Sequence, residues 1–204
     1  MISATLRLIA CTFTLLFIPC GGALADTPNS HGITIAAGTS DMDHDFYRVA
    51  GRFGWDKRWF DDPEGNWYLT GQFEAGGFYL ESTSDATQYR DAAESLYGVF
   101  VTPIFRLQRN AYSFGLAPFV EAGIGVSYIS ETWIKSDTFT GADFGSHFQF
   151  EDKLSFGTRF GSRQQFELAF TFIHHSNANI KKPNHGIDTS NIFLLVLAAR
   201  HAGV

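Results

Sequence analysis

Apolar and polar side chains alternate along most of this chain, and this alternation limits the possible folds more than any other feature of the sequence. Successive side chains of a β-strand point to opposite faces, so each alternating run gives a strand with one apolar and one polar face. Eight such runs predict eight strands, over residues 31–39, 46–55, 67–80, 94–107, 112–130, 144–160, 164–175 and 191–200.

The first 25 residues have the composition of a secretory signal peptide. Arg7 is their only charged residue, residues 8–19 are mostly apolar, and Ala23-Leu24-Ala25 is a small-residue cleavage site. The apolar run is shorter than the ~20 residues that a membrane-spanning helix needs. We expect cleavage after Ala25, which removes both cysteines, Cys11 and Cys20.

The remaining chain, residues 26–204, has no linker or break in composition, so we expect it to form a single domain without a disulfide. No stretch of it is long and apolar enough to predict a transmembrane helix. The full sequence has 15 basic and 21 acidic side chains. This acidic excess argues against nucleic acid as a partner, because a polyanion is bound by surplus positive charge.

Eight antiparallel strands of this kind can close in two ways. A soluble lipocalin-like barrel buries its apolar face around a ligand, whereas an outer-membrane barrel turns that face to lipid and keeps polar groups inside. In the second case the polar faces would supply charges of both signs that pair in the interior, namely Arg48, Arg52, Glu74, Glu121, Glu151, Lys153, Arg159 and Glu167. Alternation alone leaves both possibilities open.

Strand length and flanking aromatic residues favour the membrane. Several runs reach the ~9–11 residues that a tilted strand needs to cross a bilayer. Aromatic residues suited to the membrane interface lie near the predicted strand ends, namely Trp55, Trp59, Trp67, Tyr68, Tyr79, Tyr128 and Trp133. We therefore expect an all-β, eight-stranded antiparallel transmembrane β-barrel in the outer membrane of a Gram-negative bacterium.

A histidine and a serine share the apolar face of the 164–175 run. His174 and Ser176 continue the alternation of the preceding phenylalanines, and their Cα atoms would be roughly 6–7 Å apart. Histidine can activate a serine as general base, and a carboxylate is then needed to support the imidazolium. Asp188 is the only acidic residue after Ser176, and an antiparallel return would bring it beside His174. Alternatively, both polar residues merely cap the barrel rim.

Residues 174–188 resemble the signature of the PagL family of outer-membrane lipid A 3-O-deacylases. The shared features are His174-x-Ser176-Asn177-Ala178 and Pro183-Asn184-x-Gly186-Ile187, followed by an acidic residue. The resemblance implies that His174 is the base, Ser176 the nucleophile and Asp188 the acidic member. This chain has Asp188 where we expect glutamate, and His175 in place of an aromatic residue. By alternation His175 points inward.

The resemblance also implies the activity, which is hydrolysis of an ester-linked acyl chain of lipopolysaccharide on the lipid-facing exterior, without a cofactor or metal. Asn177 is the candidate oxyanion donor, and Lys181 and Lys182 are candidates for contacting lipid A phosphate. The expected partners are lipid A or lipopolysaccharide and outer-membrane lipids, with a second copy of the chain as a possible homodimer partner. The alternative is a non-catalytic barrel with a structural or interaction role.

Two further features remain. Residues 41–45, Asp-Met-Asp-His-Asp, lack the spacing of a calcium loop and are interpreted as a flexible acidic loop. Residues 56–66, 82–93 and 131–143 are expected to be loops that can gate or lengthen a substrate groove.

Overall fold

The computed structural model describes residues 31–62, 64, 66–85, 91–137 and 141–197, so the expected signal peptide lies outside the described residues. Within this part of the chain, no helix is long and apolar enough to cross a membrane. The strands are β1 (Gly32–Ser40), β2 (His44–Asp61), β3 (Trp67–Ser82), β4 (Ser95–Arg109), β5 (Ala117–Ile129), β6 (Trp133–Ile134), β7 (Ala142–Asp143), β8 (Phe148–Phe160), β9 (Phe166–Ser176) and β10 (Ile187–Leu197).

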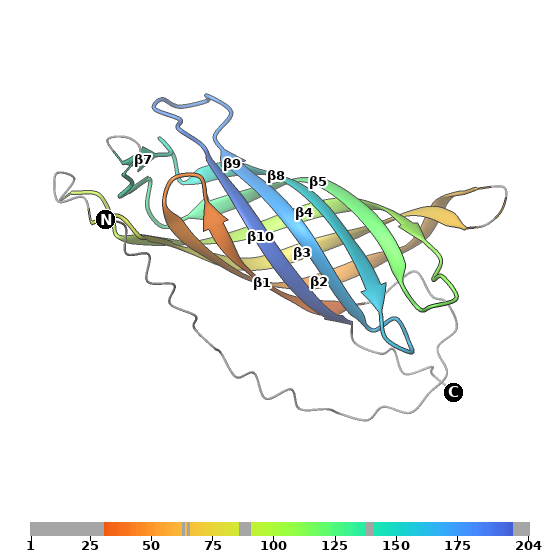
Figure 1. Ribbon diagram of the computed structural model, residues 1–204. Coiled ribbons are helices and arrows are strands. Elements are labelled where there is room, and N and C mark those ends of the chain that lie inside the picture. Colours follow the sequence, from red (N-terminus) through yellow and green to blue (C-terminus); the bar gives the residue numbers. More distant parts are fainter. Residues whose placement is uncertain (1–30, 63, 65, 86–90, 138–140, 198–204) are drawn as a thin grey trace, which may run out of the picture.

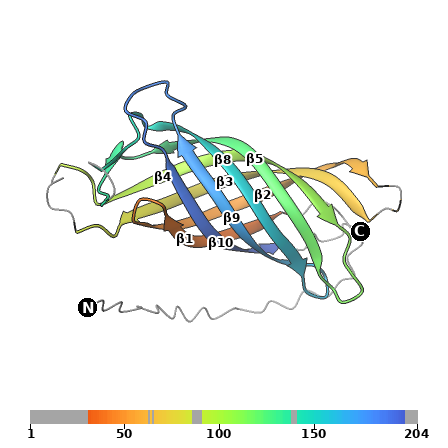
Figure 2. The same ribbon diagram turned by 45° about the horizontal axis from the view of Figure 1, so that its top comes forward.

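Eight of these strands form a closed antiparallel barrel in the order β1-β10-β9-β8-β5-β4-β3-β2 (Figures 1 and 2). Strands β6 and β7 form a separate small sheet at the end of the barrel that also carries the β9–β10 loop. The predicted all-β, eight-stranded barrel is therefore confirmed. Closure pairs β1 with β10, so no barrel strand is left with an unpaired edge.

The observed ends of β2 and β10 differ from the predicted ones. β2 continues to Asp61, so residues 56–61 are strand rather than the expected loop. The β2–β3 register shifts between Gly54 and Arg58 and again between Arg58 and Phe60, and each shift interrupts the alternation that sequence reading relies on. β10 begins at Ile187, four residues before the predicted start, because its backbone pairs with β9 from His175 onward.

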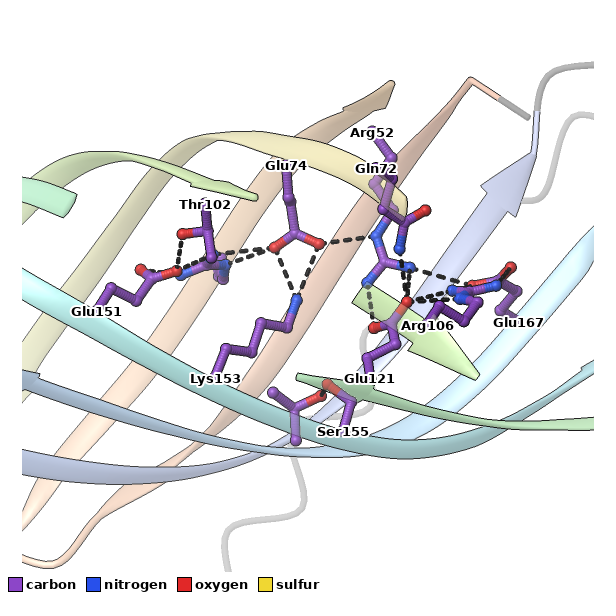
Figure 3. A network of polar contacts seen from close by, with 12 residues as sticks. Arg52, Gln72, Glu74, Thr102, Arg106, Glu121, Glu151, Lys153, Ser155 and Glu167 are labelled. Carbon is purple, nitrogen blue, oxygen red and sulfur yellow. Dashed lines mark hydrogen bonds and ion pairs between the residues drawn. The ribbon is translucent and has the colours of Figure 1, made fainter. Parts of the chain in front are cut away.

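The barrel interior holds a buried network of ion pairs (Figure 3). Glu74 lies 2.7 Å from Arg52 and 2.9 Å from Lys153. Arg48 pairs with Glu151 at 2.8 Å. All eight predicted interior charges are buried, and Arg106, which the sequence reading missed, joins them between Glu121 and Glu167. Each charge is paired, as a buried ionic group must be to offset its loss of hydration.

The outer face of the barrel is apolar. Phe53, Phe73, Phe105, Phe156, Phe170, Phe172 and Ile192 are all exposed, by 43% to 61%. A water-soluble monomer rarely exposes a continuous apolar surface of this extent, whereas a lipid-facing barrel requires it. Trp59, Tyr79 and Tyr128 are exposed as expected for interfacial aromatics. Tyr68 is not: it is buried, because it lies on the inward-facing side of β3, and its ring stacks on Arg58 at 3.6 Å.

The end of the barrel near the β9–β10 loop is closed by apolar packing. Ile134, Ala142 and Phe144, from the β6–β7 sheet and the residue after it, are buried against Met42 and Leu96 of the barrel. Residues 131–137 and 141–144 therefore form a cap, rather than the open loop that was expected over residues 131–143. The cap lies beside the β9–β10 loop, and the backbone N–H of His185 in that loop donates to the carbonyl of Asp143 at 3.0 Å.

Candidate active site

His174 and Ser176 lie on the outer face of β9. Their neighbours Phe170 and Phe172 are exposed by 43% and 45%, whereas Ile173, between Phe172 and His174, is 2% exposed and faces the interior. The imidazole of His174 is 42% exposed. The alternation that predicted a histidine and a serine on the apolar face is thus confirmed, and both side chains are accessible from the side on which lipid lies.

Asp188 contacts His174 through the register of β9 and β10. The two residues are directly opposite each other in the ladder, and the Nδ1 atom of His174 lies 2.7 Å from Oδ1 of Asp188. Since an ionised carboxylate only accepts hydrogen bonds, the imidazole hydrogen resides on Nδ1 and the lone pair on Nε2. His174 is therefore oriented and in the tautomer that a general base needs.

Ser176 lies two residues beyond His174 on the same face, opposite Phe150 of β8. Within the described residues its hydroxyl has no hydrogen-bond partner, so it is free to approach a substrate. Gly186 packs against the imidazole: a Cβ atom built there would lie 3.1 Å from Cε1 of His174 and 3.6 Å from Nε2. Gly186 also has a φ of +64°, which favours glycine.

Asp152 is a second carboxylate beside His174, and the sequence reading missed it. It lies opposite His174 on β8, faces outward and is exposed. Its signal was present in the sequence, because Asp152 alternates with Phe150 and Leu154 and so belongs to the lipid-facing side. The imidazole is flanked by one acidic residue on each neighbouring strand.

A groove of about 960 Å³ begins at His174, Asp152 and Asp188. Its lining follows two adjacent rows of outward-facing residues across five strands, which are Asp188, His174, Asp152, Ile124 and Pro103 in one row, and Ser190, Phe172, Leu154, Ala122 and Phe105 in the other. The surface therefore changes from polar at β9 and β10 to apolar at β4 and β5. Such a groove can hold an alkyl chain with its polar end near His174.

Asn177 is buried at the start of the β9–β10 loop. Its side-chain amide donates hydrogen bonds to the backbone oxygens of Phe144 and Lys181, both at 2.7 Å. Its backbone N–H donates to Oδ1 of Asn184 at 2.9 Å. The hydrogen bonds of Asn177 therefore connect the two ends of the β9–β10 loop to each other and to the cap. Lys181 and Lys182 are exposed in the same loop.

His175 points into the barrel, as its position in the alternation predicted. Its Nε2 atom donates to Glu151 at 3.2 Å, and its ring packs against Phe78 with the centroids 4.8 Å apart. It is one of the interior residues and not a second base beside Ser176.

Residues 41–43 form a hydrogen-bonded turn between β1 and β2, with Met42 and His44 buried. No group of histidine, cysteine, aspartate or glutamate side chains among the described residues is arranged to hold a metal ion.

The sequence and the fold of the chain are similar to those of known proteins. Residues 47–196 match the family model described as lipid A 3-O-deacylase (PagL). The chain is 30% identical to the lipid A deacylase PagL of Pseudomonas aeruginosa, over 79% of this chain and 83% of that protein. It is 27% identical to the PagL of Bordetella bronchiseptica, over 85% and 86% of the two chains. A crystal structure of the outer membrane enzyme PagL superposes with a TM-score of 0.67 and 28% identity, covering 81% of this chain and 98% of that one.

Proposed function

The chain belongs to the PagL family of lipid A 3-O-deacylases, and from this premise we propose that it hydrolyses the ester-linked 3-O-acyl chain of lipid A with Ser176, His174 and Asp188 as its catalytic triad. The family and the lipid-facing barrel place the protein in the outer membrane. Its substrate would reach the triad from the lipid side without leaving the bilayer.

The 2.7 Å contact between His174 Nδ1 and Asp188 Oδ1 carries this proposal. Nε2 of His174 takes the proton of Ser176 as the serine oxygen attacks the ester carbonyl, and Asp188 stabilises the imidazolium that forms. His174 then gives the proton to the departing sugar oxygen, which leaves an acyl group on Ser176. The same histidine next deprotonates a water molecule, whose oxygen attacks the acyl carbonyl. The bond to Ser176 breaks, the fatty acid leaves, and His174 returns the proton to the serine oxygen.

The contact also supports Asp188 as the acidic member despite its shorter side chain. Aspartate has one methylene fewer than the glutamate of the resemblance, yet direct pairing of Asp188 with His174 across the ladder brings its carboxylate within hydrogen-bonding distance. The triad lies within one chain, so the proposed chemistry needs no second copy.

The groove supports the same function. Its apolar rows across β5 and β4 would hold the acyl chain, with the ester at the polar end beside His174. Lys181 and Lys182, exposed in the adjoining loop, would lie toward the phosphorylated sugar.

Asn177 remains the proposed oxyanion donor, with a condition. Both N–H groups of its amide are donated to backbone carbonyls, so one of these bonds must be released before Asn177 can stabilise the tetrahedral intermediate.

Lipid A composition in Gram-negative outer membranes tests the proposal. Mass spectrometry should show loss of one ester-linked acyl chain in cells that express the wild type, and intact lipid A in cells that express Ser176→Ala. Ser113→Ala is the matched control, because Ser113 is exposed in a turn at the opposite end of the barrel. Identical lipid A from wild type, Ser176→Ala and empty cells would instead support the non-catalytic barrel.

A further inference from the structure

Asp41 is hydrogen-bonded to the backbone of Asp188 in both directions. The backbone N–H of Asp41 donates to the carbonyl oxygen of Asp188 at 3.0 Å, and the backbone N–H of Asp188 donates to Oδ1 of Asp41 at 3.0 Å. The regular β1–β10 ladder ends one step earlier, at Ser40 and Thr189. The Asp41 carboxylate therefore accepts the hydrogen bond that a backbone carbonyl would accept if the ladder continued.

The turn that carries Asp41 is itself held in place. Oγ of Ser40 accepts hydrogen bonds from the backbone N–H groups of Met42 and His44, at 3.1 and 3.2 Å. His44 Nε2 donates to the carbonyl of Lys135 in the cap at 2.8 Å, so its Nδ1 accepts from the Ser40 hydroxyl at 2.9 Å. Asp41 is thus presented to β10 by a turn anchored to the cap.

We propose that Asp41 is a positioning residue, which holds the backbone of Asp188 so that its carboxylate stays in contact with His174. This inference rests on the proposed function, because it has meaning only if Asp188 is the acidic member of the triad. Aspartate has only two side-chain torsions, so the location of its carboxylate depends directly on its backbone. The hydrogen bond to the Asp188 N–H acts on that backbone, one residue from where the strand leaves the β9–β10 loop.

The test uses the purified full chain in detergent micelles with lipid A as substrate. Asp41→Ala removes the acceptor and should lower kcat about tenfold, the effect of a barrier change equal to one ordinary hydrogen bond, while KM changes less than about twofold. Asp41→Asn keeps an oxygen acceptor at the same atom and should restore kcat to within about threefold of wild type. Asp45→Ala is the matched control, since it removes a nearby carboxylate that is not bonded to Asp188.

A second background separates positioning from general damage to the fold. Asp188→Glu carries a longer, more adaptable acidic side chain, so Asp41→Ala should lower kcat less in this background than in the wild type. Equal losses in both backgrounds would show that Asp41 does not act through the reach of Asp188. The folded fraction of each variant is read from its mobility in unheated SDS gels.

The outcomes distinguish this inference from the proposed function. Full activity of Ser176→Ala and Asp188→Asn would overturn the triad itself. If those two variants lose activity while Asp41→Ala, folded as the wild type is, matches the wild type, the triad stands and the role of Asp41 is refuted. Failure of Asp41→Asn to recover more activity than Asp41→Ala would also refute it.

Discussion

His175 donates a hydrogen bond to Glu151 at 3.2 Å, so the residue between the two proposed catalytic side chains belongs to the ionic network inside the barrel. Glu151 also accepts two hydrogen bonds from Arg48 at 2.8 Å and one from Thr102 at 2.6 Å. One short segment of β9 therefore carries His174 and Ser176 on its lipid-facing side, and on its inner side it is hydrogen-bonded to a buried carboxylate.

Removal of the Glu151 charge should destabilise the barrel more than removal of the His175 bond. Glu151→Gln removes one of the two carboxylates that pair with the buried Arg48 guanidinium, the other being Glu74, and should cost about 3 kcal/mol. His175→Phe loses a single hydrogen bond and should cost about 1–2 kcal/mol. Urea unfolding in micelles measures both. Equal costs would contradict the assignment of Glu151 as the shared anchor.

Gly186→Ala should impair catalysis by displacing the imidazole. The added Cβ would lie 3.1 Å from Cε1 of His174, and the backbone has a φ of +64°. We expect a loss of about 1–2 kcal/mol of stability from the backbone alone and a fall in kcat of roughly tenfold from the misplaced base.

Gly115→Ala separates these two effects, because Gly115 has a φ of +87° and no atom within 4 Å of its built Cβ. It should reproduce the loss of stability with unchanged kcat. A comparable fall in kcat for both variants would mean that backbone strain, not contact with His174, explains the effect.

Asn177 and Asn184 together test the oxyanion role. Asn184→Ala removes the acceptor of the Asn177 backbone N–H and so loosens the loop without touching the Asn177 amide. If Asn177 stabilises the oxyanion, Asn177→Ala should lower kcat by a further ~10²–10³ relative to Asn184→Ala. Similar rate constants for the two variants in a lipid A assay would assign Asn177 to the loop alone.

Ala122→Trp should change the preference for acyl-chain length. Ala122 faces outward in the apolar part of the groove, and an indole there would occupy space for the distal carbons. We expect kcat/KM for long-chain esters to fall at least about tenfold, with short-chain esters affected less than about twofold. Val99→Trp, on the lipid-facing side of β4 outside the groove lining, is the control. Uniform loss across chain lengths would place the acyl chain elsewhere.

Local alternation was enough to determine the faces of the strands. It predicted that His174 and Ser176 lie on the lipid side with the phenylalanines, that His175 points inward, and that Glu74, Glu151 and the other strand charges lie inside. These predictions succeeded because side-chain direction in a strand depends only on the position of a residue within its own run. Tyr68 and Arg106 obey the same alternation, because they face inward with Thr70 and Ile104. They were missed because Tyr68 was assigned to the interfacial aromatics and the run over residues 94–107 was interpreted as apolar.

Contacts between strands were decided by the tertiary structure, because the register of each pair depends on where its turns and bulges fall. That register sets Asp188 and Asp152 on either side of His174 and leaves Asn177 bonded to the cap. It also brings Asp41, 147 positions away in the sequence, to the backbone of Asp188. The sequence thus contained the residues of the proposed lipid-facing triad, and strand pairing in the closed barrel determined which of them meet.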